Sequence, residues 1–401
     1  MSSLPARDFT NPRAKHGFQG RTCSVTGVGA YVPERVVTNA DLEKVVETTD
    51  EWITSRTGIR ARRIAADNEF CSDLAARAAE RAMAMAGVTA DQIDLIIVAT
   101  ITPDMPFPST ACLVQHKIGA KRAAAFDLEA ACSGFIYALE VGQQFIMSRT
   151  SECVLVIGAE KLSSIMDWKD RTTCVLFGDG AGAAILQHRP ESHGLLTACM
   201  GADGGKAALL SQPGGGCRFP ATRESVDQRL HFLKMDGKEV FKNAVNAMCT
   251  AAREALARCE LTVSQIKCVI PHQANLRIIE AVAKYAGIPM ERVMVTVHKY
   301  ANMSAATVPV SLVEALKEGR VRPGSLLLMP GFGGGLTYGA LLVRWGSRVT
   351  PLATSDAAFP PLTGTALDMV NQIRAAQDPH GRSQQGLTAP VFAEARVPAT
   401  R

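Results

Sequence analysis

The sequence lacks any apolar run long enough to cross a membrane. Its longest runs, such as 95–98 and 326–329, are strand-sized, whereas a membrane-spanning helix needs about 18 apolar residues. With 47% hydrophobic and only 20% charged residues among 401, the chain is also too apolar and too weakly charged for a disordered protein. We therefore predict a folded protein without a membrane span.

Cysteine pairs typical of disulfide or zinc frameworks are missing as well. The eleven cysteines are odd in number and scattered, with no CxxC pair, and a chain of this length does not need disulfides for stability. We predict reduced cysteines, a cytoplasmic location and one reactive thiol at most. The histidines form no ligand cluster, so no metal is expected. A net charge of +5 is too small for a nucleic-acid-binding protein but leaves room for a local basic patch.

The two ends of the chain differ from its body. Residues 1–21 are basic and contain no apolar segment of the secretory type, so we interpret them as an N-terminal extension in preference to an organellar transit segment. Residues 347–401 contain six prolines and no lysine, which predicts a mostly irregular tail. Only 365–377 has helical spacing of its apolar residues, and we expect one short helix there, docked on the body.

The body, from about residue 22 to 346, alternates apolar strands with amphipathic helices, as in α/β folds. A helix is expected over 73–86, with Ser72 as its N-cap. The order of strands, helices and glycine-rich turns repeats, so we predict a duplicated α/β unit with halves at 22–190 and 191–346. Cys132 and Asn302 take equivalent positions in this repeat. Strands are expected at 95–100, 125–127, 153–157, 184–186, 268–270, 294–297, 325–329 and 340–343.

Cys132 is the candidate nucleophile. It lies in Ala131-Cys132-Ser133-Gly134, where a strand leads into a helix expected over 136–148. A cysteine at a helix N-terminus is expected to have a lowered pKa, because the helix dipole and free N–H groups favour the thiolate. A thiolate can form a thioester and so divide an acyl transfer into two easier steps.

Two polar residues of the second half complete the candidate site. His272 directly follows an apolar strand, in Pro271-His272-Gln273-Ala274-Asn275, and α/β proteins place their sites at such strand ends. Asn302 opens a helix in the second half. Both side chains can be neutral hydrogen-bond donors, which suits the stabilisation of an enolate oxygen. Only the repeat predicts that Cys132, His272 and Asn302 meet.

The glycine-rich turns do not indicate a dinucleotide site. Gly178–Ala183 matches G-x-G-x-x-G/A on paper, yet it leads into an apolar strand, whereas the dinucleotide fingerprint requires a following helix. Gly333–Gly335 indicates close backbone approach, with an N–H presented to a ligand oxygen. No cofactor is expected.

Six motifs in order resemble β-ketoacyl-acyl-carrier-protein synthase III. They cover residues 22 to 346, over four-fifths of the chain. The resemblance implies the thiolase-like fold, a duplicated α/β unit in five layers (α-β-α-β-α), usually in a homodimer. The motifs are the segments around Cys132, His272 and Asn302, together with 50–59, 178–182 and 331–335.

The resemblance also implies a two-stage acyl transfer. Cys132 attacks an acyl-CoA and becomes acylated, then His272 and Asn302 hydrogen-bond the thioester carbonyl of malonyl-acyl-carrier protein while it loses CO2. The enolate attacks the acyl-cysteine and gives 3-ketoacyl-carrier protein, the first step of fatty acid synthesis. The backbone N–H groups of Cys132 and Gly334 match the family's oxyanion hole.

Other positions match the family's substrate-binding residues. Acyl-CoA is thereby a substrate, with no separate cofactor. Phe107 matches the residue that closes the acyl pocket across the dimer in members that use short primers. The expected CoA contacts are Trp52, Arg56 and Arg171, and the expected basic patch for the carrier protein is Lys242, Arg277 and Lys284.

The sequence departs from the family pattern at a few positions. Ala301 and Met303 flank Asn302 where the family more often has Gly and Thr, Thr172 and Thr173 replace a more usual Gly-Thr, and the tail has no counterpart in short members. These departures leave the primer open. Three other hypotheses also remain: a condensing enzyme of specialised metabolism, an acyltransferase acting on an alcohol or amine, and a non-catalytic partner subunit.

Overall fold

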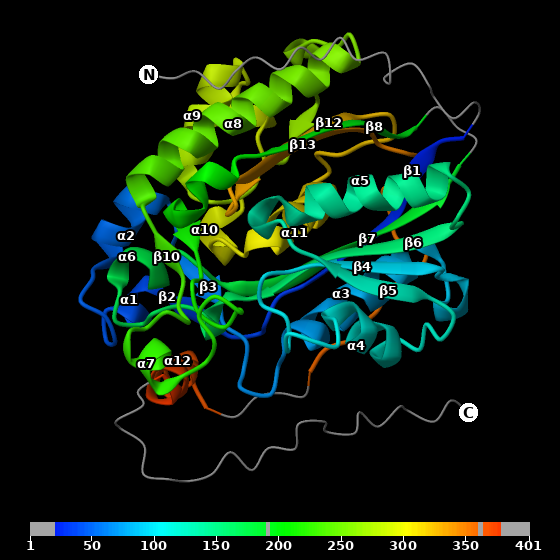
Figure 1. The fold of residues 1–401 in the computed structure, drawn as a ribbon. Helices are drawn as coiled ribbons and strands as arrows, with labels where there is room; N and C mark the ends of the chain where they lie inside the picture. Colours follow the sequence, from blue (N-terminus) through cyan, green and yellow to red (C-terminus); the bar gives the residue numbers. More distant parts are fainter. Residues whose placement is uncertain (1–20, 190–192, 360–363, 378–401) are drawn as a thin grey trace.

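The computed structural model describes residues 21–189, 193–359 and 364–377 (Figure 1). The N-terminal extension, apart from Arg21, and the tail beyond residue 377 lie outside this range. Residues 190–192, at the predicted boundary between the halves, also lie outside it, so that boundary stays a prediction.

The first sheet has five strands in the order β1-β7-β6-β4-β5. β4 pairs in parallel with β5 and β6, and the other two pairings are antiparallel. The buried strands are almost continuously apolar, as expected for a sheet covered on both faces. Its strands are β1 (Cys23–Tyr31), β4 (Leu95–Ala99), β5 (Ala124–Leu128), β6 (Cys153–Lys161) and β7 (Asp179–His188).

The second sheet repeats this order with one strand fewer, β8-β13-β12-β11. β11 and β12 are parallel, and β13 is antiparallel to both of its neighbours. In place of a fifth strand there is a single bridge between Val269 and Val293, so the strand expected at 294–297 does not form. The four strands are β8 (Gly194–Ala202), β11 (Cys268–Val269), β12 (Leu326–Gly333) and β13 (Thr337–Arg344).

Helices cover and separate the two sheets, giving five layers (Figure 1). α3 (Cys71–Ala86) and α4 (Thr110–Lys117) cover the first sheet, and α8 (Gly237–Arg258) and α9 (Leu276–Ala286) cover the second. α5 (Gly134–Met147) and α11 (Thr307–Lys317) lie between the sheets. The common strand order and the five layers confirm the predicted fold class.

The remaining elements are short and lie around one end of the sheets. They are α1 (Asn39–Leu42), α2 (Asp50–Thr57), α6 (Arg171–Cys174), α7 (Arg223–Asp227), α10 (Val297–Tyr300), β2 (Val36–Thr38), β3 (Ala61–Arg63), β9 (Leu210–Ser211) and β10 (Lys234–Met235). Two 3-10 turns, η3 (Ala131–Ser133) and η8 (Ser304–Ala306), immediately precede α5 and α11.

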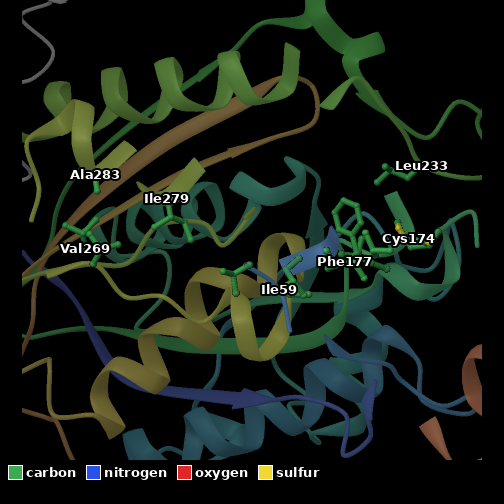
Figure 2. Packing of buried hydrophobic residues seen from close by; sticks show 14 of the residues in the cluster. Ile59, Cys174, Phe177, Leu233, Val269, Ile279 and Ala283 are labelled. Carbon is green, nitrogen blue, oxygen red and sulfur yellow. The ribbon is translucent and has the colours of Figure 1, made fainter. Parts of the chain in front are cut away.

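The largest apolar cluster extends from the second sheet to these short elements. Figure 2 shows Val269, Ile279 and Ala283 on one side of it and Phe177 and Cys174 on the other. All of these side chains are buried. Burial of this kind is the main driving force for folding, at roughly 25 cal/mol per Å² of apolar surface removed from water.

Two local predictions are wrong. Ser72 does not cap α3, because the helix begins at Cys71, and the Ser72 hydroxyl instead donates to Asp104 at 2.5 Å. Cys132 and Asn302 are not equivalent either. Ala131 and Ser304 both have φ of 45° and both open a 3-10 turn. In that register, the counterpart of Cys132 is Ala305.

The tail returns along the outside of the first sheet. Leu352 and Ala353 donate backbone hydrogen bonds to the C-terminal turn of α3, and the Phe359 ring lies 5.5 Å from the Tyr31 ring. The expected helix forms as α12 (Ala366–Ala376), whose Thr365 makes a capping box with Asp368. Its buried side chains, Met369, Val370 and Ile373, dock it against α1 and β2.

Among the helices of the described residues, none is both long enough and apolar enough to cross a membrane. The eleven cysteines are all free, as predicted.

Candidate active site

One cavity of about 900 Å³ contains Cys132, His272 and Asn302 in its lining. Cys132 comes from η3 in the first half, and the other two residues come from loops in the second half. The structure therefore brings together the three side chains that the sequence placed in the candidate site. Their meeting follows from contact between η3 and η8, where the two halves face each other.

Cys132 is held by close backbone packing. A Cβ atom on Gly333 of β12 would lie 2.5 Å from the Cys132 nitrogen, so only glycine permits this approach. Cys132 is 7% exposed, and burial raises the pKa of its thiol to about 12, although the Ser304 hydroxyl acts in the opposite direction. The expectation of a lowered pKa is therefore wrong for the empty site, because desolvation outweighs the helix dipole.

His272 is fixed on both sides. Its backbone N–H donates to the Pro330 carbonyl at 2.9 Å, and the next residue, Gln273, anchors the loop through four hydrogen bonds to backbone groups. Burial lowers the pKa of the imidazole to about 3, so His272 is neutral at physiological pH.

The Thr307 hydroxyl decides which ring nitrogen of His272 carries the proton. Thr307 Oγ1 lies 2.7 Å from His272 Nδ1 and 2.9 Å from the Ser304 carbonyl oxygen. A hydroxyl has one proton. When Thr307 donates to Ser304, it accepts from Nδ1–H; when it donates to Nδ1, the proton of the imidazole is on Nε2.

Asn302 is aligned by its backbone and its carbonyl oxygen. Its N–H donates to Leu176 and its C=O accepts from Gly178, while Oδ1 accepts from the Ser304 N–H at 2.8 Å. Among the described residues, its Nδ2 has no hydrogen-bond partner, so this amide can donate to a bound molecule.

The two departures beside Asn302 have different consequences. Ala301 has φ of 57° and ψ of −159°, a region that essentially only glycine adopts without strain. Met303 is buried against Ala306 and Val310 and does not line the cavity. The first departure therefore stores strain next to the site, and the second leaves the shape of the cavity unchanged.

Comparisons with known proteins agree with the arrangement of the cavity. The family described as 3-oxoacyl-[acyl-carrier-protein (ACP)] synthase III matches residues 126–204, and its C-terminal part matches residues 256–345. The chain is 54% identical to a β-ketoacyl-[acyl-carrier-protein] synthase III of Symbiobacterium thermophilum over 326 residues, covering 81% of this chain and 99% of that one. The chain belongs to the β-ketoacyl-acyl-carrier-protein synthase III family.

Solved structures of synthase III proteins share the fold. The structure of the enzyme from Aquifex aeolicus has a TM-score of 0.76 and 48% identity and covers 80% of this chain and all of its own. The priming β-ketosynthase of the R1128 polyketide pathway has a TM-score of 0.77 and 36% identity and covers 82% of this chain and 97% of its own.

The residues expected to contact CoA in a synthase III lie together at the cavity. Trp52 and Arg56, on α2, line it, and the Arg56 guanidinium lies 4.7 Å from the centre of the Trp52 ring. Arg171 approaches the same ring at 5.3 Å and donates to the Glu47 carbonyl. An indole and two guanidinium groups thus form one cluster at the cavity.

The residues expected at the carrier-protein surface lie on two neighbouring helices. Lys242 is on α8, where it pairs with Glu239 at 2.7 Å. Arg277 and Lys284 are on α9; all three are exposed, and Arg277 also lines the cavity. Phe107 is 84% exposed and does not line the cavity of its own chain.

Sequence reasoning missed three polar residues around the site. Thr307 and Ser304 follow Asn302 in the same motif, and their hydroxyl groups were a signal that was present but unused. Glu160 lies at the end of the apolar strand β6, where a carboxylate without a nearby basic residue in the sequence is unusual.

Proposed function

We propose that Cys132 carries the acyl group and that His272 and Asn302 stabilise the enolate in the family's condensation reaction. As a synthase III, the chain is an acyltransferase that condenses an acyl-CoA primer with malonyl-ACP and thereby starts fatty acid synthesis. The products are 3-ketoacyl-ACP, CoA and CO2. The single observation behind these residue assignments is that the three side chains line one cavity.

In the first stage, Cys132 Sγ attacks the thioester carbonyl of acyl-CoA. The N–H groups of Cys132 and Gly334 are the proposed donors to the oxyanion of the tetrahedral intermediate. This assignment is supported by Gly334 lining the cavity and by the close approach of β12 to Cys132. Expulsion of the CoA thiolate leaves the acyl group on sulfur.

In the second stage, malonyl-ACP loses CO2 while its thioester oxygen accepts two hydrogen bonds. Asn302 Nδ2 supplies one of them. His272 Nε2 supplies the other when the Thr307 hydroxyl donates to Nδ1. Both donors are neutral and held in place before the reaction, so they stabilise the developing enolate with little reorganisation. The enolate carbon then attacks the acyl-Cys132 carbonyl and frees the thiol.

The remaining assignments concern substrates and assembly. Trp52, Arg56 and Arg171 are proposed to hold the nucleotide end of CoA, because an indole stacks on a base and guanidinium groups bind phosphates. Lys242, Arg277 and Lys284 are proposed to bind the acidic carrier protein. No further cofactor and a cytoplasmic location are part of the proposal.

A homodimer is proposed from the exposed side of the first sheet. Phe107 is a large apolar side chain at 84% exposure, and β5 is an edge strand. Exposed apolar groups beside an open strand edge are typical of subunit contacts. In that dimer, Phe107 would close the acyl pocket of the partner and favour short primers.

Intact mass spectrometry tests the acyl-cysteine directly. Incubation with a short-chain acyl-CoA is expected to add one acyl mass, located on Cys132 by peptide mapping. The Cys132→Ala variant is expected to lose both the adduct and the condensation with malonyl-ACP. Condensation that persists in this variant would contradict the proposal. Cys217→Ala, at an exposed cysteine, is the matched control.

The 36% identity to a priming β-ketosynthase of a polyketide pathway supports a second candidate function. In it, the same condensation primes specialised metabolism. A panel of acyl-CoA primers with malonyl-ACP distinguishes the two by product length. Use of medium-chain primers alone would favour the second candidate and contradict the assignment of Phe107.

A further inference from the structure

Ser304 contacts all three residues of the proposed site. Its N–H donates to Asn302 Oδ1, and its carbonyl accepts from Thr307, whose hydroxyl meets His272. Its hydroxyl lies beside Cys132 and lowers the pKa of the thiol against the larger effect of burial. Ser304 is 1% exposed, and its Oγ has no partner of full hydrogen-bond geometry within the described residues. This hydroxyl is therefore free to turn.

A buried carboxyl group lies on the other side of that hydroxyl. Glu160, at the end of β6, is fully buried and accepts from the Thr102 hydroxyl at 2.6 Å and from the Thr100 hydroxyl and Ile101 N–H at 3.2 Å. Within the described residues it pairs with no lysine or arginine. Burial raises the pKa of Glu160 to about 7, although its hydrogen bonds, including one from Ser304, act in the opposite direction.

The packing of η8 on β6 explains why these groups meet. A Cβ on Gly158 would lie 2.4 Å from the Ala305 carbonyl oxygen, so glycine lets the turn rest directly on the strand. Ser304 opens that turn, and Glu160 is two residues beyond Gly158. The other titratable groups that face Glu160 are the Cys71 thiol of α3 and the Cys132 thiol of η3. Burial raises the pKa of both, so neither is charged near neutral pH.

The nucleophile needs a proton acceptor. With a pKa of about 12, Cys132 is a thiol near neutral pH, and it becomes a good nucleophile only as its proton departs. A general base works best when its own pKa lies near the working pH. Of the described groups near the thiol, Glu160 meets this condition.

We propose that Glu160 is the base for acylation of Cys132 and that the Ser304 hydroxyl relays the proton. The proposal rests on Cys132 being the acyl carrier. As Sγ bonds to the thioester carbon, the thiol proton passes to Ser304 Oγ and the hydroxyl proton of Ser304 passes to Glu160. When the tetrahedral intermediate collapses, the C–S bond to CoA breaks, and the CoA thiolate takes up one proton as Glu160 returns its own. The net change is thioester plus thiol giving thioester plus thiol.

The acylation stage can be measured alone, by mixing the protein with acyl-CoA without malonyl-ACP and following the adduct mass after rapid quenching. The variants are Glu160→Gln and Ser304→Ala. Ala131 adopts the φ of 45° found at Ser304, so alanine suits that backbone. The matched control is Glu69→Gln, a second buried carboxyl group, which bonds the Ala66 N–H.

The acylation rate of the parent protein is expected to rise with pH and to level off above about 7, because the base form of Glu160 is then complete. Glu160→Gln is expected to lower the plateau about 100-fold and to remove this pH dependence. Ser304→Ala is expected to lower it at least tenfold, and the double variant to be no slower than Glu160→Gln, since both lie on one path. Glu69→Gln is expected to keep the parent rate and profile.

Two outcomes overturn the proposal: Glu160→Gln with the parent rate and pH profile, or a slower variant that keeps the pH profile, as a purely structural role of Glu160 predicts. Ser304→Ala gives the same decision if Glu160→Gln does not fold. Failure of the proposed function is distinct, since the parent protein would then form no adduct on Cys132 at all.

Discussion

The two junctions that lead into α5 and α11 share a backbone but carry different chemistry. Each is a 3-10 turn that opens with φ of 45° and continues into a central helix. In the first, the second residue of the turn is Cys132, which faces the cavity. In the second, it is Ala305, whose carbonyl packs against Gly158. The polar groups of the second junction lie before and after it, at Asn302, Ser304 and Thr307.

This difference shows how a duplicated fold makes one site from two similar parts. Duplication gives the same conformation at both junctions, and their contact brings them to one cavity. Only one junction provides a nucleophile, whereas the other provides hydrogen-bonding groups. The asymmetry lies in side chains and not in the backbone.

The largest expected effect comes from removing the thiol and moving it to the other junction. Cys132→Ala should lose the acyl adduct and the condensation entirely. The double variant Cys132→Ala/Ala305→Cys should not recover either, because residue 305 does not line the cavity. Adduct mass and 3-ketoacyl-ACP formation are the measurements. Recovery by the moved thiol would mean that the two junctions are interchangeable.

Thr307 is the polar group of the second junction that has no counterpart in the first, where Gly134 takes its place. Thr307→Val removes the hydroxyl that holds His272 Nδ1, so the decarboxylation of malonyl-ACP should slow about tenfold, since a positioned hydrogen bond is lost. Thr307→Ser should keep the parent rate, and acylation should change little in both variants. CO2 release measures the first stage against the second, and equal loss in both stages would contradict this role.

The neutral state of His272 predicts a pH effect on stability. Burial lowers the pKa of the folded-state imidazole to about 3, below the ordinary value of about 6.5. Between these values only the unfolded state takes up the proton, so stability is lost as the pH falls below 6.5. From pH 7 to 5.5, the parent should lose about 1 kcal/mol more than His272→Gln. Urea unfolding at both pH values measures this difference, and equal losses would show that His272 is protonated when folded.

The smallest effect concerns the strain that precedes the second junction. Ala301→Gly should stabilise the protein by about 1 kcal/mol, since relief of strain exceeds the entropy cost of glycine. Thermal unfolding measures the gain. Ala257→Gly, at an exposed position in α8, should instead cost about 0.5 to 1 kcal/mol. A loss at residue 301 would mean that the alanine side chain contributes more by packing than it costs by strain.

Much of the fold could be predicted from periodicity and turn chemistry. Apolar runs identified β4, β6 and β12, and the glycine-rich turn before residue 184 was correctly assigned to a strand. The helix start at Ser72 was misplaced because the residue pattern of a cap does not show which hydroxyl has a better partner elsewhere. The strand at 294–297 was misplaced because its apolar residues pack in a loop with a single bridge.

The sequence by itself determined the duplicated α/β fold, the family and the identity of the three candidate residues, because periodicity and ordered motifs are local properties of the chain. The tertiary structure decided their charge states and partners. Burial makes Cys132 a thiol and His272 neutral, contrary to the helix-dipole expectation for the thiol, since desolvation depends on every element that encloses a group. It also decided that Ser304 lies between Cys132 and Glu160, because residues 132, 160 and 304 become neighbours only when the two halves pack.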